Sequence, residues 1–306
     1  MESSELPRTL HPLTGPLPAS LAQGSVDGLG PAAAPARALI ERKVLPADVF
    51  AGMTLYLLTQ QPRRSARDGP KRGAVEGGVW VREQVSCHRP MRLDEVVTVS
   101  GESLARFTRR GRRYGVTRSE TRGTDGRRVA SNLTTGLLSY RKQPELEDQH
   151  LGVPEGELPL PKPDPEPASE NPCLDRLRVV RSGEVLDGES ILVTLELMRL
   201  RDAGRDHNPI HTDPTIAARE GLAAPIAGGS HVLAFLQARL MAEWGPECLL
   251  YGAHFDVRWV GQTYAETRIR PRITVVEASR QELRCQLEVV GEERPLLHGE
   301  LRLPLA

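Results

Sequence analysis

Apolar and polar residues form two similar blocks along the chain, each with one helical segment followed by alternating segments. In the first block, residues 38–44 look strand-like, and residues 47–58 have the apolar spacing of a helix, although Gly52 weakens it. Segments with apolar and polar alternation follow, separated by turn signals such as Thr124-Asp125-Gly126. They cover residues 79–87, 95–109, 112–123 and 129–141. This block predicts one helix followed by an antiparallel meander.

The second block repeats the first in outline. Residues 177–185 look strand-like, residues 195–203 look helical, and a stronger helix is predicted over residues 231–245. One face of that helix carries apolar side chains at helical spacing: Val232, Phe235, Leu236, Leu240 and Trp244. Alternating segments come after it, at residues 253–260, 266–278, 282–290 and 296–305. Each half of the chain is therefore predicted to be an α+β domain with one main helix and an antiparallel sheet.

Two segments lack a core-forming pattern and set the predicted domain boundaries. Residues 1–30 are rich in Pro, Gly, Ser and Ala without apolar periodicity, which predicts a disordered or loosely docked leader. Residues 144–172 contain eight prolines and more acids than bases, a composition typical of an extended linker. The sequence thus predicts an N-terminal domain over residues 31–143 and a C-terminal domain over residues 173–306.

Composition narrows the class of partner. The formal net charge is zero and aromatic residues make up 4% of the chain, which argues against nucleic acid as a partner. No apolar run has the length of a signal peptide or a membrane span, so no membrane partner is expected. The four cysteines show no Cys-x-x-Cys spacing, which fits a reduced, cytoplasmic protein. We expect a small-molecule or carrier-bound substrate.

Titratable residues concentrate in the loop from Arg205 to Asp213, just ahead of the strongest predicted helix. Asp206 and His211 stand five residues apart in this loop and can converge on one water as a general acid–base pair. Pro209 prevents a continuous helix, which weighs against a zinc site built on His207 and His211 at helical spacing. We therefore expect no metal.

The start of the helix after this loop offers a second kind of chemical group. Gly228 and Gly229 allow a substrate carbonyl to approach closely. The first turn of a helix has free backbone N–H groups and the positive end of the helix dipole, which can polarise that carbonyl. Together with the acid–base pair, these groups suit reversible addition of water to an α,β-unsaturated thioester.

The residues of this region also form a long motif. Residues 206–213 read Asp-His-Asn-Pro-Ile-His-Thr-Asp, and Ala217, Gly221, residues 225–227 (Pro-Ile-Ala) and Gly229 follow. This motif resembles the signature of the MaoC-like, (R)-specific enoyl-CoA hydratase family. The resemblance implies a double hotdog fold, in which each half is a central helix wrapped by an antiparallel β-sheet. It also implies that the enzyme needs no cofactor.

The same resemblance suggests roles for individual residues. It makes Asp206 and His211 the catalytic pair, Gly229 the backbone oxyanion donor beside Gly228, and Asn208 a residue that orders the loop. Members of the family usually have a histidine immediately before the glycine, where this chain has Gly228. The N-terminal half contains no Asp-x-Asn-Pro-x-His segment, so it resembles a degenerate hotdog that shapes the acyl tunnel.

Some of these residues have simpler interpretations. Asp206 and His211 can be turn-capping and surface residues. His207 and Asp213 are interpreted as loop-structuring, and His231 as a cap or surface residue of the first helical turn. A basic loop can bind the phosphates of coenzyme A or an acidic carrier protein, but is more simply a solvated loop. It contains Arg63, Arg64, Arg67, Lys71 and Arg72.

Three functions are compatible with these features. The leading hypothesis is a hydro-lyase that hydrates trans-2-enoyl thioesters, or dehydrates 3-hydroxyacyl thioesters, of coenzyme A or acyl carrier protein. The second is a hotdog thioesterase, because the same helix terminus can polarise a thioester carbonyl. The third is a non-catalytic subunit that binds acyl thioesters. Pairing of two chains into a homodimer is compatible with all three.

Overall fold

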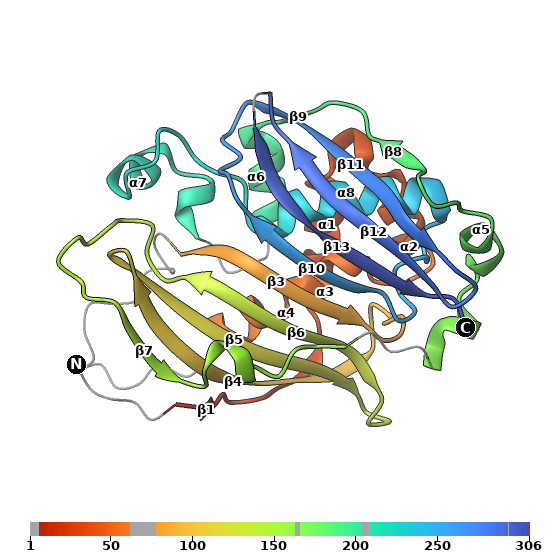
Figure 1. Cartoon of the computed structure of the whole chain (residues 1–306), viewed down its shortest axis with the longest axis horizontal. Helices are drawn as coiled ribbons and strands as arrows, with labels where there is room; N and C mark the ends of the chain where they lie inside the picture. The colour runs from red at the N-terminus through yellow and green to blue at the C-terminus, as the bar shows by residue number, and fades with distance from the viewer. Residues whose placement is uncertain (1–5, 62–77, 163–165, 204–207, 293) are drawn as a thin grey trace.

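A computed structural model describes residues 6–61, 78–162, 166–203, 208–292 and 294–306 of the chain. Among these residues the strands join into one antiparallel sheet of 13 strands, and the main helices lie behind it in the view of Figure 1. One cluster of buried apolar side chains runs through both halves. Within the described part of the chain, we find no helix with the length and hydropathy needed to cross a membrane.

The sheet has the same strand order in both halves. In the N-terminal half, β3 (Val79–Cys87) pairs with β6 (Arg128–Leu137), then come β5 (Arg112–Gly123) and β4 (Val96–Arg109). In the C-terminal half, β10 (His254–Trp259) pairs with β13 (Pro295–Pro304), then come β12 (Glu282–Val290) and β11 (Thr267–Ala278). Strands β3 and β10 pair with each other at the junction of the halves, where Ser86 of β3 lies opposite His254 of β10. The two halves are thus structural repeats, as the sequence predicts.

Each repeat packs one helical segment against its strands. The predicted C-terminal helix is α8 (Gly229–Trp244), which is largely buried behind β11 and β12. The predicted N-terminal helix is divided at Gly52 into α3 (Ala47–Ala51) and α4 (Met53–Thr59). The Phe50 carbonyl at this break accepts a hydrogen bond from Asn132 Nδ2 of β6 at 2.9 Å. A side chain from the sheet therefore replaces a helical partner at the break.

The prediction of a disordered leader is wrong for the described residues 6–30. Strands β1 (Arg8–Thr9) and β2 (Leu13–Pro16) pair with β4, and α1 (Ala19–Asp27) packs on α6 (Leu195–Asp202). A Cβ added to Gly24 would lie 2.9 Å from the Arg201 carbonyl oxygen, and one added to Gly28 would lie 2.7 Å from Arg201 Cβ. Small residues allow this close approach, and they give no apolar periodicity in the sequence.

Two further predictions of local structure need correction. Residues 38–44 were expected to be a strand but belong mostly to the helix α2 (Ala34–Glu41), which follows a 3-10 turn at Gly30–Ala33. A short apolar run fits either structure, and the buried Ala36 and Leu39 lie on one helical face. Residues 177–185 are the end of α5 (Leu174–Arg178), a turn, and the start of β8 (Val185–Asp187), which pairs with β11. The short β9 (Ile191–Val193) also pairs with β11.

The proline-rich linker packs against the N-terminal sheet where it is described. Strand β7 (Gln149–Gly152) pairs with β4, and Ser86 Oγ of β3 donates a hydrogen bond to the Lys162 carbonyl at 2.8 Å. Val153 and Leu158 cover buried side chains of β4, β5 and β6. Short 3-10 turns form at Glu155–Glu157 and Glu166–Glu170. The basic loop from Arg63 to Arg72 lies outside the described residues.

A buried ion pair connects the two halves behind the sheet. Arg201 at the end of α6 is 1% exposed and pairs with Asp48 of α3, which is 2% exposed. Ser25 Oγ of α1 donates a hydrogen bond to Asp48 at 2.8 Å, and Arg201 donates to the Ser230 carbonyl of α8 at 3.3 Å. Four helices therefore meet at one charged side chain.

We expect Arg201→Met to lower the free energy of unfolding by about 3–5 kcal/mol, because it leaves the Asp48 carboxylate buried without its cation. The double variant Asp48→Leu/Arg201→Met removes both charges and should regain most of the loss. Urea unfolding followed by circular dichroism measures both values. Equal losses in the single and double variants would show that the pair contributes through packing alone.

The inner face of the N-terminal sheet is unusually polar. Glu83 of β3 is fully buried, and its Oε1 accepts a hydrogen bond from Asn132 Nδ2 at 2.8 Å. Burial raises the pKa of the Glu83 carboxyl to about 8, because the charged form loses its hydration and the bond from Asn132 offsets this only in part. Other buried polar residues on the neighbouring strands are Thr117, Ser119, Thr121 and Thr134.

This raised pKa predicts a pH-dependent stability. The folded chain keeps the Glu83 proton up to its pKa of about 8, whereas the unfolded chain loses it above the ordinary carboxyl pKa of 4.5. The protonated Glu83 therefore makes its full contribution to the free energy of unfolding below about pH 4.5. As the pH rises towards 8, this free energy falls by about 1.4 kcal/mol per pH unit. We expect Glu83→Gln to raise Tm relative to the unsubstituted protein progressively between pH 5 and pH 8. A difference in Tm that is constant over this range would contradict the assignment.

Candidate active site

The candidate site lies where the loop after α6 meets the first turn of α8. Residues 204–207, which include Asp206 and His207, lie outside the described part of the chain. The loop is described again from Asn208, where Pro209–His211 form a 3-10 turn, and α7 (Pro214–Arg219) follows. Pro209 stands at the first position of that turn, where its missing N–H costs nothing.

Two polar side chains hold this loop in place. Asn208 Nδ2 donates to the Gly78 carbonyl, next to β3, at 2.6 Å, and Asn208 Oδ1 accepts from the Ile210 N–H at 3.4 Å. Asp213 accepts hydrogen bonds from the N–H groups of Thr215 at 2.8 Å and Ile216 at 3.2 Å, which caps α7. The loop-structuring interpretation of Asp213 is thereby confirmed. Asn208 bonds the loop to the N-terminal half.

The imidazole of His211 is held with one nitrogen towards α8. Its Nδ1 lies 2.7 Å from the Ile226 carbonyl oxygen. A carbonyl only accepts hydrogen bonds, so Nδ1 carries the hydrogen and Nε2 has the lone pair when the ring is neutral. Nε2 lies 3.6 Å from the position that a Cβ on Gly228 would occupy. The basic nitrogen therefore lies next to the residue that precedes α8.

The first turn of α8 presents a free backbone donor at this place. Gly228 is the N-cap residue, and no side chain caps the helix. The His231 and Val232 N–H groups bond back to the Gly228 carbonyl, at 2.9 and 3.2 Å. Among the described residues, none accepts a hydrogen bond from the Gly229 N–H. His211 Nε2 and this N–H thus belong to or lie beside two consecutive residues, Gly228 and Gly229, at the start of α8.

Two tryptophans form the other side of the site. A Cβ added to Gly229 would lie 3.0 Å from Trp259 Cε2 and 3.1 Å from Trp80 Cβ. Trp80 is the second residue of β3, and Trp259 is the last residue of β10. Their rings meet edge to face, with centroids 5.7 Å apart and an interplanar angle of 67°. The two halves thus supply one indole each. The sequence analysis missed both residues, although tryptophan is rare in this chain and both stand in the strands at the junction.

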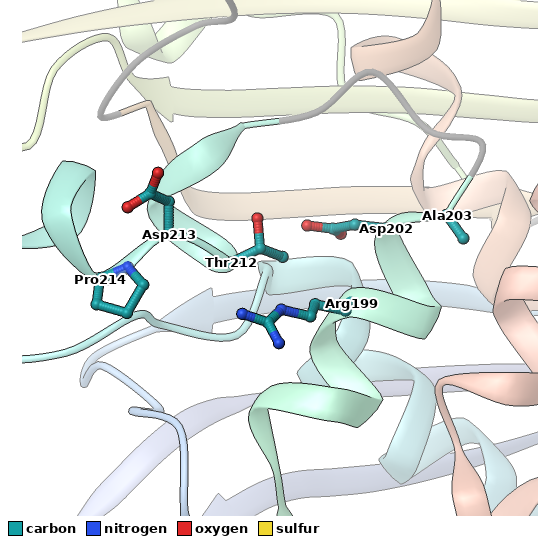
Figure 2. Close-up of a pocket in the computed structure, with 6 residues that line it drawn as sticks. All are labelled: Arg199, Asp202, Ala203, Thr212, Asp213 and Pro214. Atoms are coloured by element: carbon teal, nitrogen blue, oxygen red, sulfur yellow. The ribbon is translucent and has the colours of Figure 1, made fainter.

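A pocket of about 490 Å³ opens beside the loop. Figure 2 shows the Asp202 carboxylate directed towards Thr212, with Arg199 on the preceding turn of α6. Asp202 Oδ2 is buried and has no hydrogen-bond partner within the described structure. The lining consists of Arg199, Asp202, Ala203, Thr212, Asp213 and Pro214.

The prediction that His231 is a cap or surface residue is wrong. Its side chain is 1% exposed, Nε2 lies 2.7 Å from the Gly28 carbonyl oxygen, and its ring stacks on Phe235 with centroids 4.9 Å apart. The error follows from the error on the leader, because α1 and Gly28 cover this part of α8. His231 thus holds the N-terminal segment on the helix.

These features define a class of protein: two α+β repeats, each with a helix packed against an antiparallel sheet, which is the double hotdog fold. Within it, residues 183–293 match the family model of the MaoC-like domain. The chain therefore contains a MaoC-like domain, which includes the loop, α8 and most of the C-terminal sheet. No curated protein matches the sequence significantly.

Solved structures support the same fold over nearly the whole chain. A MaoC-like dehydratase has a TM-score of 0.70 at 15% identity and covers 98% of each chain. A conserved Mycobacterium tuberculosis protein with a double hotdog fold has a TM-score of 0.65 at 15% identity, covering 98% of this chain and 96% of its own. A Lactobacillus plantarum protein, provisionally named an oleoyl thioesterase, has a TM-score of 0.55 at 10% identity, with 98% and 97% covered.

The contacts of the two glycines predict different tolerances. Gly229→Ala places a methyl group against two rigid neighbours and should cost about 1–3 kcal/mol of stability, although alanine favours a helix. Gly228→Ala makes only an ordinary contact with His211, at 3.6 Å, and should change stability by about 0.5 kcal/mol or less. Thermal unfolding of the two variants checks this. Equal stability would show that the indoles do not pack on Gly229.

Proposed function

We propose that the protein is a hydro-lyase that reversibly hydrates trans-2-enoyl thioesters, or dehydrates 3-hydroxyacyl thioesters, with (R) stereochemistry. The observation that carries the proposal is the geometry of His211. The Ile226 carbonyl fixes its tautomer, and Nε2 lies beside Gly228, the residue that precedes α8. The MaoC-like domain match over residues 183–293 supports the same reaction class.

The proposed chemistry needs three groups. In the hydration direction, the water oxygen bonds to C3 of the enoyl group and a proton is delivered to C2. Asp206 and His211 share these proton transfers, with His211 Nε2 able to accept a proton and Nδ1–H held by Ile226. As the water adds, negative charge develops on the thioester oxygen. The Gly229 N–H at the positive end of α8 stabilises this charge.

The N-terminal half has a supporting role in this proposal. It supplies Trp80 beside Gly229, the Gly78 carbonyl that holds Asn208, and Asp48 beneath α8. We propose that it also shapes the tunnel for the acyl group, as a hotdog without catalytic residues of its own. The thioester is carried by coenzyme A or an acyl carrier protein.

Thioester hydrolysis is the second candidate, favoured by the fold shared with the Lactobacillus plantarum protein. A hydrolase would release free thiol from a saturated acyl thioester, whereas a hydro-lyase would leave it unchanged. Both activities can be followed on one preparation, with crotonyl-CoA for hydration and butyryl-CoA with a thiol reagent for hydrolysis. Tight binding of both thioesters without turnover would identify a non-catalytic binding subunit.

The acid–base assignment predicts large losses of activity. We expect Asp206→Asn and His211→Gln each to lower kcat for crotonyl-CoA hydration by about 10²–10⁴-fold, because each removes a proton-transfer group. Asp94→Asn and His298→Gln change exposed residues in the same chemical way and serve as controls. The decrease in absorbance of the enoyl thioester measures the rate. Activity close to that of the controls in either site variant would exclude that residue from the pair.

A further inference from the structure

The indole of Trp259 carries a polar group for which the fold offers no partner. Trp259 Nε1 is buried and has no hydrogen-bond partner within the described structure. An indole N–H is a donor only, and buried donors in native proteins are nearly always paired with protein, water or ligand. Trp259 is at the end of β10, on the inner face that also carries Phe255 and Val257. The unpaired N–H therefore lies inside the protein, on the helix side of the sheet.

The position of this group connects it to the site. The ring atom that lies closest to Gly229 is Cε2, 3.0 Å from where a Cβ would be, and Cε2 is bonded directly to Nε1. The indole N–H thus lies one bond from the atom that packs on the first residue of α8. The Gly229 N–H is also without a described partner, and His211 Nε2 lies beside Gly228. Two donors without a described partner and one basic nitrogen thus belong to Gly229 or to side chains that lie beside Gly228 and Gly229.

We propose that Trp259 Nε1–H is a second oxyanion donor, which bonds the thioester oxygen together with the Gly229 N–H. This inference rests on the proposed function. The negative charge that reaches the thioester oxygen, as water bonds to C3, is shared between a backbone and a side-chain donor. Both donors are fixed before the reaction, one by α8 and the other by packing against Trp80, so little reorganisation accompanies the charge.

The chain provides a matched control for this residue. Trp244, the last residue of α8, is also buried and its Nε1 also has no described partner. It stands 15 residues after Gly229, about 22 Å along the helix at 1.5 Å per residue. Trp259→Phe and Trp244→Phe make the same chemical change, and only the first removes an N–H from the site.

Kinetics of crotonyl-CoA hydration test the proposal first. We expect Trp259→Phe to lower kcat on the order of 10²-fold with little change in KM, because the lost bond is strongest in the transition state. Trp244→Phe should retain kcat, and Tm of both variants monitors folding. A loss in Trp259→Phe no larger than that in Trp244→Phe would overturn the proposal.

Nuclear magnetic resonance tests the contact without turnover. The chain has three tryptophans, so ¹⁵N-labelled protein gives three indole N–H signals, which the Trp→Phe variants assign. We expect saturating butyryl-CoA to move the Trp259 signal downfield and to leave the Trp244 signal unchanged. S-butyl coenzyme A, a thioether without the carbonyl oxygen, should not produce this shift.

The outcomes separate this inference from the proposed function. Binding of butyryl-CoA without a shift of the Trp259 signal overturns the inference, even if Trp259→Phe is slow, and leaves the hydro-lyase proposal intact. A carbonyl-dependent shift in a protein without hydration activity supports the contact and counts against the hydro-lyase. Absence of any acyl-thioester binding counts against both.

Discussion

The buried charge of Arg201 is the constraint on which the arrangement of the site depends. A guanidinium without water must be neutralised and hydrogen-bonded, and Asp48, Ser25 and the Ser230 carbonyl do this from three different helices. Arg201 is also the next-to-last residue of α6, just before the loop, and Ser230 belongs to the first turn of α8. One side chain thus fixes the start of the loop relative to the helix terminus.

The same interaction explains why the N-terminal half is retained without a motif of its own. Asp48 belongs to α3, the helix of the N-terminal repeat, and it is the carboxylate that Arg201 requires. The Gly78 carbonyl and Trp80 reach the site from the same half. A single repeat would leave Arg201 unpaired, Asn208 without its anchor and one side of Gly229 open. The site is therefore a product of both halves, although its titratable residues come from one.

The repeated architecture can be predicted from the sequence because it consists mainly of long segments with regular apolar spacing. The apolar spacing of α8 and the alternation in the long strands follow directly from burial on one face. Failures occur where small residues make the contacts. Gly24 and Gly28 give no apolar signal, yet they let α1 approach Arg201, and through this helix His231 becomes buried. The contact between Trp80 and Trp259 could not be predicted from the sequence, because only the pairing of β3 with β10 brings residues so distant in sequence together.

The inner faces of the two halves of the sheet differ in polarity. In the C-terminal half, most residues facing α8 are apolar, as in Leu287, Leu301 and Leu303. In the N-terminal half, Glu83 and Asn132 face the break between α3 and α4. These hydrogen bonds fix the position of the break between α3 and α4, which apolar packing alone would not specify. The buried carboxyl that responds to pH therefore lies in the N-terminal half, whereas the C-terminal strands pack against α8 mainly through apolar side chains.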